Sequence, residues 1–574
     1  MKGKYILGIN SVFHDSSACL LKNGILVSAV EEERFTRIKH AKPAKVSNGG
    51  VLPVNSINYC LVQSGLKLSD VDYIAVSFNP KKRLENIEAD KYYTPGDWGS
   101  KEGEEKFYND VMTIPKQLSD MAGEDISNKF VWVDHHMAHA ASVFFVSPYK
   151  ESLILVVDGI GEISTTSIGV GKGNKIKIFK EINYPNSIGF LWERISEYLG
   201  FTEYEAGIVM GLGSYGKQKK YKKQFEKLVK LDSKNIYTAD VDILRFRMWD
   251  FTQLEKLFGI KKREKNEKIT QEHMDIAAGL QYITGKVTFE LIKYATKEHP
   301  SEYVCLAGGV ALNCVANEEI FQKFSFKDVY LTSAPNDSGT SVGAAYYVWN
   351  QMLNKERKFV YTHAFWGPEY SDAQIEKKLK SSKNDLEYTK EKNIEKKAAE
   401  LIADSNIIAW FQGKLEFGPR ALGNRSILAD PRNKNMLDII NKKVKEREWF
   451  RPFAPSVLED LVDDFFVFPK QPEPLFSDRF MIFAVEPKYP EDIPAVVHVD
   501  NTCRFQTVPK DFNPKYYKLI NEFYKITGIP IVLNTSFNIQ EPIVCTPQDA
   551  INTFKRSKID YLIMNNYLIK HKLQ

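Results

Sequence analysis

Three of the ten histidines of this chain lie within five residues, at His135, His136 and His139. On a helix, His135 and His139 would be one turn apart on the same face, where two imidazoles can hold one metal ion. The zinc-protease pattern needs a glutamate directly after the first histidine, and His136 occupies that position. Hydrogen-bonded core histidines are the alternative, but three so close together favour a metal site. Asp337, in a glycine-bounded loop, is a candidate carboxylate ligand.

A fourth histidine, His14, stands next to Asp15 in a polar loop that follows a short apolar run. An imidazole in such a loop could accept a proton from a hydroxyl group close to a phosphate-binding turn. A single histidine can equally be structural. From the residues alone, both readings of His14 stay open.

Cationic residues form a separate group in the later part of the chain. Arg420, Lys445 and Arg451 stand among glycine, proline and aromatic residues and not on a uniformly charged helix. Partly buried cations need an anionic partner, so together with Arg504 they indicate a polyphosphate cradle. Surface salt bridges are the alternative for any one of them. The polar run 534–538 directly follows an apolar strand run and adds a predicted loop suited to ligand contacts.

The elements that must position these residues follow a repeated pattern. An apolar run at residues 6–10, a polar turn and a hairpin are matched by a second series that starts at residues 153–157. The repeat indicates two related β-sheet lobes, with chance similarity of two hairpins as the alternative. A third loop, 308–313, follows the apolar run 303–307 and would either admit a nucleotide or permit tight packing of a strand against a helix. Helical periodicity predicts a helix over 271–292.

The length of 574 residues favours two to four domains. Apolar residues make up 43% and charged residues 26%, which excludes wholesale disorder. The net charge of +5 is small, and we interpret the basic run 217–223 as a solvated helix face and not as a nucleic-acid patch. The charged region 351–371, which contains a Gly-Pro pair, is the best boundary and predicts domains at 1–355 and 356–574.

The six cysteines are scattered and include no Cys-x-x-Cys pair, which is typical of a reducing compartment. The N-terminus reaches a polar loop before a signal-peptide apolar region develops, and no later apolar run approaches the roughly 18 residues that span a bilayer. We therefore expect a soluble, unanchored, cytoplasmic protein without disulfides.

Taken together, these residues resemble the NodU/TobZ-type O-carbamoyltransferases, a family in which a Kae-type ASKHA (actin-like) domain is joined to a YrdC-like domain. The resemblance runs along nearly the whole chain. It rests on motifs in family order: His14-Asp15-Ser16, the run 31–37, His135-His136 with His139, Asp158-Gly159 with Gly161-Glu162, Gly211-Leu212 with Tyr215-Gly216, the run 308–313, the run 417–426, the run 450–455 and the run 534–538.

The resemblance implies an α/β fold and a reaction in two steps. A duplicated ASKHA domain of the Kae type, residues 1–355, would be followed by an α/β YrdC-like domain, residues 356–574. The YrdC-like domain would make carbamoyl adenylate and pyrophosphate from ATP and carbamoyl phosphate. The Kae-type domain would then transfer the carbamoyl group to a hydroxyl of a sugar or natural-product acceptor during biosynthesis. The implied cofactors are ATP, with Mg, and an iron-like divalent metal at the transfer site.

The resemblance also implies which residues form the activation site. By matching motif positions, the residues that hold the phosphates and the carbamoyl group would be Arg420, Lys445, Arg451, Arg504 and Asn534. Lys445 and Arg451 would be catalytic as well.

In the transfer domain, the resemblance implies that His135, His139 and Asp337 bind the metal. It places Gly309 and Asn313 near the adenosine. His14 would be the acid/base residue of the transfer step.

Two departures from the family pattern could reshape the acceptor pocket: residues 10–13, where small residues are usual, and the turn at 211–216. A threonylcarbamoyl-type transferase acting on tRNA is an alternative function, which the lack of a strongly basic segment disfavours. A non-catalytic ASKHA nucleotide-binding regulatory protein is another, which the cation group disfavours. The expected partners are carbamoyl phosphate and a small, sugar-containing hydroxyl acceptor, without membrane or nucleic acid. A homodimer is left open.

Overall fold

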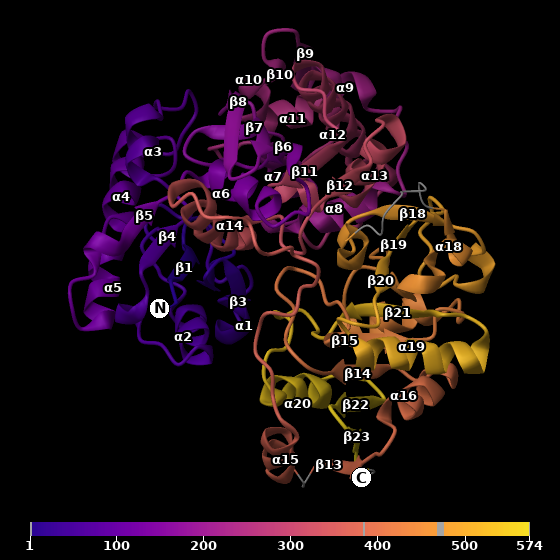
Figure 1. Ribbon diagram of the computed structural model, residues 1–574. Coiled ribbons are helices and arrows are strands. Elements are labelled where there is room, and N and C mark those ends of the chain that lie inside the picture. The colour runs from indigo at the N-terminus through magenta and orange to yellow at the C-terminus, as the bar shows by residue number, and fades with distance from the viewer. Residues whose placement is uncertain (1–2, 383–384, 468–475, 573–574) are drawn as a thin grey trace. The chain divides into compact units, whose positions relative to one another are not determined.

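The computed structural model describes residues 3–382, 385–467 and 476–572. They form two compact units (Figure 1): unit 1 comprises Met1–Glu32 and His40–Tyr361, and unit 2 comprises Glu33–Lys39 and Thr362–Gln574. The short segment Glu33–Lys39 folds with unit 2 because its arginines reach backbone carbonyls there. Arg34 donates to the carbonyl of Gly418 at 2.7 Å, and Arg37 donates to that of Ile543 at 2.6 Å.

The first lobe of unit 1 is a five-stranded sheet in the order β3-β2-β1-β4-β5. The first three strands form an antiparallel meander, and β4 and β5 run parallel to β1. Asn23 and Gly24 both have positive φ, as the tight turn between β2 and β3 requires. The strands are β1 (Tyr5–Asn10), β2 (Ser17–Lys22), β3 (Ile25–Glu31), β4 (Tyr73–Val76) and β5 (Phe130–Trp132).

The second lobe repeats this arrangement in the sheet β12-β11-β6-β7-β8. Read from β8, three antiparallel strands are again followed by two parallel ones. The strands are β6 (Glu151–Val157), β7 (Ser164–Lys172), β8 (Lys175–Asn183), β11 (Tyr303–Ala307) and β12 (Asp328–Tyr330). The equal strand order confirms the predicted duplication and the ASKHA-type fold of unit 1.

Two helices between the lobes position the first group of candidate residues: the histidines lie on the first helix, and Asp337 lies in the turn just before the second. Helix α6 (His135–Phe144) packs against α14 (Thr340–Tyr346). A Cβ atom at Gly343 would lie 1.7 Å from the carbonyl oxygen of Ala138, so only glycine permits this close approach. Helix α6 is therefore fixed against α14, which directly follows the turn Asp337–Gly339.

The other α-helices of unit 1 lie in the segments that connect its strands. They are α2 (Val54–Gln63), α3 (Pro80–Asn86), α4 (Lys101–Val111), α5 (Ile114–Ala122), α7 (Ile188–Tyr198), α8 (Ala206–Gly213), α9 (Lys222–Leu228), α10 (Val241–Leu244), α11 (Thr252–Phe258), α12 (Gln271–Glu298) and α13 (Cys314–Lys323). Helix α12 confirms the helix predicted over 271–292. The helix-face interpretation of 217–223 is wrong for residues 217–221: residues 217–220 form an exposed turn before α9, and Tyr221 is buried.

Unit 2 is built on an eight-stranded mixed sheet in the order β13-β23-β22-β14-β15-β21-β16-β20. Its strands are β13 (Leu386–Lys390), β14 (Ile408–Phe411), β15 (Arg425–Ala429), β16 (Ala454–Leu458), β20 (Gln506–Val508), β21 (Ile531–Ser536), β22 (Tyr561–Met564) and β23 (Tyr567–His571). A small sheet adds β17 (Phe466–Val467), β18 (Ala484–Pro487) and β19 (Cys503–Arg504). The helices are α1 (Glu33–Thr36), α15 (Asp372–Lys380), α16 (Ile394–Ala403), α17 (Met436–Ile439), α18 (Val462–Phe465), α19 (Pro514–Thr527) and α20 (Pro547–Arg556).

The core of unit 2 lies between the sheet and helices α16 and α19, where Trp410, Tyr516 and Phe523 are fully buried. The expected polar loop at 534–538 is only partly a loop. Residues 534–536 continue β21, because this central strand pairs with β15 on one side and β16 on the other.

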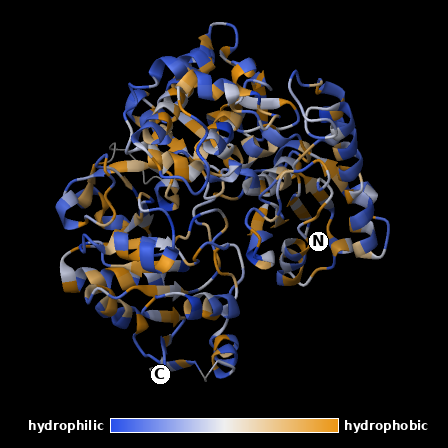
Figure 2. Cartoon of the chain, turned by 180° about the vertical axis from the view of Figure 1, so that it is seen from behind, coloured by the Kyte–Doolittle hydropathy of each residue, from blue (hydrophilic) through white to orange (hydrophobic). Residues whose placement is uncertain are grey.

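The distribution of hydrophobic residues agrees with this layering. Figure 2 shows hydrophobic residues gathered along the strands inside each unit and hydrophilic residues on the outer helices. All six cysteines are buried and free, as expected. Among the described residues, no helix combines the length and the hydropathy needed to cross a membrane.

Candidate functional site

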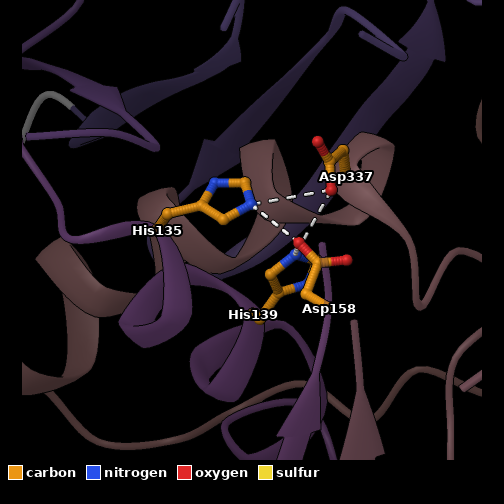
Figure 3. Close-up of side chains that lie close together, drawn as sticks. All are labelled: His135, His139, Asp158 and Asp337. Carbon is orange, nitrogen blue, oxygen red and sulfur yellow. Dashed lines mark ion pairs between the residues drawn. The ribbon is translucent and has the colours of Figure 1, made fainter. Parts of the chain in front are cut away.

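Four buried side chains of unit 1 converge on one point (Figure 3): His135, His139, Asp158 and Asp337. The Nε2 atom of His135 lies 3.4 Å from Asp158 Oδ2 and 3.6 Å from Asp337 Oδ1. For Nε2 of His139 the corresponding distances are 3.7 and 3.4 Å. The structure thus brings the three predicted ligands together and adds a fourth. Two imidazoles and two carboxylates form a donor set that suits a divalent transition metal.

The start of α6 is fixed by Glu162, which is buried beside it. Its carboxylate accepts hydrogen bonds at 2.9 Å from the backbone N–H groups of His135 and Asn79. The first N–H groups of a helix have no partner within the helix, and a carboxylate satisfies them. Glu162 therefore fixes the turn from which both imidazoles project.

The surroundings of the two imidazoles fit a metal site. Nδ1 of His135 lies 3.1 Å from the carbonyl oxygen of Ser77, so Nδ1 carries a hydrogen and Nε2 is the nitrogen that faces the carboxylates. Nε2 of His135 and both ring nitrogens of His139 are buried without a hydrogen-bond partner. Buried polar atoms normally have partners, and a cation between the four side chains would satisfy both Nε2 atoms.

The charges in this cluster depend on one another. Burial disfavours the charged form of His135 and His139, but the carboxylates of Asp337 and Asp158 outweigh it and raise the pKa of both histidines. Protons and a metal ion would therefore compete for the same nitrogen atoms, so that metal affinity falls as the pH falls.

His14 lies next to this cluster in unit 1. Burial lowers its pKa, but the nearby carboxylates of Asp337 and Asp15 prevail and raise the pKa of His14 to about 10. The ring of Phe13, one residue earlier, packs edge-on against the ring of His135 with centroids 6.1 Å apart. The side chain of His14 is 27% exposed, so a substrate that arrives from solvent can reach it.

Gly309 and Asn313, the predicted adenosine contacts, have different surroundings. The backbone N–H of Gly309 donates to Oδ1 of Asp158 at 2.7 Å, which joins this loop to the four-residue cluster. The amide of Asn313 forms a reciprocal pair with that of Gln281, with contacts of 2.9 and 3.2 Å. Asn313 Oδ1 also caps α13 through the N–H of Ala316 at 3.1 Å. Its side chain thus holds α12 and α13 together beside the loop.

In unit 2, Lys445, a residue of the second predicted site, is buried. Its ammonium group donates to the carbonyl and hydroxyl oxygens of Ser536, and to the carbonyl and side-chain oxygens of Asn538 at 2.9 and 2.7 Å. Burial lowers the pKa of Lys445 well below its usual value, and the guanidinium groups of Arg447 and Arg451 lower it further.

The neighbouring arginines concentrate positive charge at the same place. Burial, and then the charge of Arg451, hold the pKa of Arg447 well below its usual range, and Arg504 acts in the same direction. Arg451 has a carboxylate neighbour in Glu448, at 3.5 Å, and its side chain is 30% exposed. Repulsion between the charges of Lys445, Arg447 and Arg451 is relieved when an anion binds between them.

Asn534 connects this region with the loop that carries Arg420. Its Nδ2 atom donates to Ser456 Oγ at 3.0 Å, to Gln506 Oε1 at 3.1 Å and to the carbonyl of Ala421 at 3.3 Å. Its Oδ1 atom is buried without a hydrogen-bond partner. A donor on a bound molecule would satisfy this oxygen.

Sequence reasoning missed two of these residues as site members. Asp158 belongs to a quoted motif, and its position at the end of a buried strand, before a glycine, was a usable signal for a ligand. Arg447 stands two residues after Lys445 and four before Arg451, so the same cationic stretch contained it.

Comparison with known proteins extends these observations. The sequence model described as Carbamoyltransferase N-terminus matches residues 5–346, and that described as Carbamoyltransferase C-terminus matches residues 399–571. The chain is 37% identical over 616 residues to the uncharacterized protein sll1178 of Synechocystis, covering 99% of this chain and 97% of that protein. It is 35% identical over 569 residues to the nodulation protein NolNO of Sinorhizobium fredii, and the match covers 98% of this chain and 80% of that protein. Among solved structures, full-length HypF in its phosphate- and nucleotide-bound form matches with a TM-score of 0.35 and 15% identity. This match covers 61% of this chain and 56% of the HypF chain.

Proposed function

Because the chain belongs to the carbamoyltransferase family, we propose that it is an ATP-dependent O-carbamoyltransferase that works in two steps at two sites. Residues 356–574 would form carbamoyl adenylate, and residues 1–355 would transfer its carbamoyl group to a hydroxyl of a sugar or natural product. One observation carries the proposal: each family-matched segment contains its own buried polar cluster, and the two clusters suit different chemistry. Fixed cations suit phosphates, whereas the His/Asp cluster suits a metal.

In the first step, water releases phosphate from carbamoyl phosphate, and an oxygen of the resulting carbamate attacks the α-phosphorus of ATP. Pyrophosphate leaves, and carbamoyl adenylate remains. Negative charge develops on the phosphoryl oxygens, and Lys445 and Arg451 would act as the catalytic cations that stabilise it. Arg420, Arg504 and Asn534 would bind ATP, which carries Mg, and the carbamoyl group.

In the second step, the acceptor hydroxyl oxygen attacks the carbamoyl carbon, and the bond from that carbon to the AMP oxygen breaks. His14 would take the hydroxyl proton at Nε2, since Nδ1 faces Asp15 at 3.1 Å. Gly309 and Asn313 would lie along the adenosine.

The four-residue cluster, His135, His139, Asp158 and Asp337, would hold the divalent metal of the transfer site, for which we propose iron. When bound, the metal would supply a Lewis acid for the carbamoyl oxygen and would offset the carboxylate charge that keeps a proton on His14. The two imidazoles are held ready for this role by α6, whose first turn Glu162 fixes.

A sugar-containing acceptor is supported by the surroundings of His14. The ring of Tyr204 lies edge-on to His14, with ring centroids 5.2 Å apart. An aromatic ring offers an apolar surface to the C–H groups of a sugar, and the hydroxyl groups of the sugar then remain available for hydrogen bonds. His14 is partly exposed, so a bulky acceptor needs to present only one hydroxyl to it.

The experiment that tests this proposal follows both steps separately. Purified protein is incubated with ATP and carbamoyl phosphate, and pyrophosphate is measured with either substrate omitted in turn. We expect pyrophosphate only when both are present. Small-metabolite extract from the host is then added, and mass spectrometry searches for compounds that have gained one carbamoyl group. Pyrophosphate release that does not need carbamoyl phosphate would contradict the first step, and release of AMP without any carbamoylated product would contradict the acceptor chemistry.

A further inference from the structure

The carboxylate of Asp15 lies between two histidines that are far apart in the sequence. Its Oδ2 atom is 3.1 Å from Nδ1 of His14, and its Oδ1 atom is 2.8 Å from Nδ1 of His40. Oδ2 also accepts a hydrogen bond from Nδ2 of Asn336 at 2.8 Å. Three donors therefore hold this carboxylate, and the residue after Asn336 belongs to the four-residue cluster.

The backbone on both sides of this contact has an unusual conformation. Phe13 and Asp15 have φ angles of 58° and 51°, and His40 and Ala41 have φ angles of 60° and 64°. Left-handed backbone at residues other than glycine persists only where the surroundings enforce it, and it gathers at functional sites. The two loops enforce it on each other, since the N–H of Asp15 donates to the carbonyl of His40 at 2.9 Å.

An aromatic ring completes the arrangement. The ring of Tyr204 stacks on that of His40, with centroids 4.7 Å apart and an interplanar angle of 27°. The same ring meets His14 edge-on. Tyr204 thus fixes the plane of the His40 ring, and Asp15 fixes the direction of its Nδ1–H bond.

We propose that His40 is a positioning residue for His14: it holds Oδ1 of Asp15, so that Oδ2 fixes the His14 ring with Nε2 directed to the acceptor. The inference rests on the proposed function of His14 as the base of carbamoyl transfer. Without the bond to His40, the two remaining donors both hold Oδ2, so the carboxylate can pivot about that oxygen, and the partner of His14 Nδ1 is no longer fixed in direction. A displaced base lowers the rate of the chemical step without weakening acceptor binding.

The same three residues can also be considered as ligands of a cation, because they form a compact His/Asp/His group. Their geometry favours the positioning role. The two histidines approach opposite oxygens of one carboxylate, with each Nδ1 at hydrogen-bond distance, and so the carboxylate itself occupies the space between them.

The test compares two variants that both tolerate positive φ at position 40. His40→Gly removes the donor to Asp15. In His40→Asn the side-chain amide nitrogen can take the place of Nδ1 and keep that donor, and asparagine is also one of the residues that accept left-handed backbone. Any difference between the variants therefore reports the hydrogen bond and not backbone strain.

Crystal structures of the wild-type protein and of both variants give a result that does not depend on activity. We expect the Asp15–His14 contact to be kept in His40→Asn and to exceed hydrogen-bond distance in His40→Gly. An unchanged Asp15–His14 contact in His40→Gly would overturn the positioning role. This outcome is separate from the proposed function, because the contact can be lost or kept whether or not the protein transfers carbamoyl groups.

Kinetics form the second arm, with ATP, carbamoyl phosphate and methyl glucoside as the hydroxyl probe. We expect His40→Gly to lower kcat by about 10- to 100-fold with little change in the KM of the probe, and His40→Asn to recover most of that loss. Pyrophosphate release should be the same in all three proteins. Equal loss in both variants, or a change confined to KM, would overturn the proposal.

Metal analysis of the three proteins distinguishes a cation site, because loss of one bound ion in His40→Gly would also overturn the proposal. If the wild-type protein fails to carbamoylate any hydroxyl compound, the proposed function fails, and the crystal structures still decide the positioning role.

Discussion

The Oδ1 atom of Asp158 accepts a hydrogen bond from the backbone N–H of Gly309 at 2.7 Å, across 151 positions of sequence. The other oxygen, Oδ2, faces the Nε2 atoms of His135 and His139. A backbone group thus orients the carboxylate toward the imidazoles, as hydrogen bonds from neighbouring groups commonly orient the side chains that bind a metal. The contact also connects the proposed metal site with the loop that we propose lies along the adenosine.

Asp158→Asn should lower metal affinity, because it replaces a charged oxygen ligand by a neutral amide in a buried site. We expect a decrease of at least about tenfold, measured by equilibrium dialysis against ferrous or zinc ions followed by elemental analysis. Asp120→Asn, an exposed aspartate paired with Lys116, is the matched control. Pyrophosphate release should be unchanged in both. Wild-type metal affinity in a folded Asp158→Asn protein would remove Asp158 from the ligand set.

Arg451→Ala should abolish most of the pyrophosphate release that depends on ATP and carbamoyl phosphate. The variant removes a fixed cation from a site where negative charge develops, for which a loss of about 10²- to 10³-fold in rate is expected. Lys525→Ala, which removes an exposed lysine of unit 2 that pairs with Glu522, is the control. The proposed activation site would be misplaced if Arg451→Ala released pyrophosphate at the rate of the control.

His14→Asn should leave metal content and adenylate formation near those of the wild type and lower carbamoyl transfer by about 10²- to 10⁴-fold. Asparagine keeps a polar side chain next to Asp15 but cannot take up the hydroxyl proton. The measurement is single-turnover transfer from preformed carbamoyl adenylate, with His299→Asn, an exposed position, as control. Transfer at the wild-type rate would return His14 to a structural role.

His363 should make the stability of unit 2 sensitive to acid. Burial lowers the pKa of His363 to about 4, and its Nδ1 accepts a hydrogen bond from the N–H of Phe365 at 3.2 Å, which needs the neutral ring. Between pH 6.5 and 4 the unfolded chain binds this proton and the folded chain does not, so the free energy of unfolding falls as the pH falls. The loss is at most about 3 kcal/mol.

The variant His363→Asn keeps an acceptor at the position of Nδ1 but has no group that titrates in this range. Its urea midpoint should therefore change less between pH 7 and pH 5 than that of the wild-type protein. An equal pH dependence in both proteins would show that other groups cause the acid sensitivity.

The sequence determined the features that depend on local spacing. The four-residue distance between His135 and His139 places them on one helix face, because the helical period is a property of neighbouring residues alone. The two strand and hairpin series likewise predicted the duplicated sheets, since each series is a continuous piece of chain. The position of polar residues after apolar strand runs predicted candidate ligand contacts.

Only the tertiary structure decided which distant residues meet. Asp158 joins the α6 histidines through the packing of α6 against β6, Asp337 joins them through the packing of α6 against α14, and His40 reaches Asp15 across 25 positions. Residues 534–536 became strand because β15 offers backbone partners to all three and β16 offers one to Asn534, although their polar side chains predicted a loop. Such contacts depend on how whole elements pack, and the energy of that packing is shared among many residues, so no local pattern specifies it.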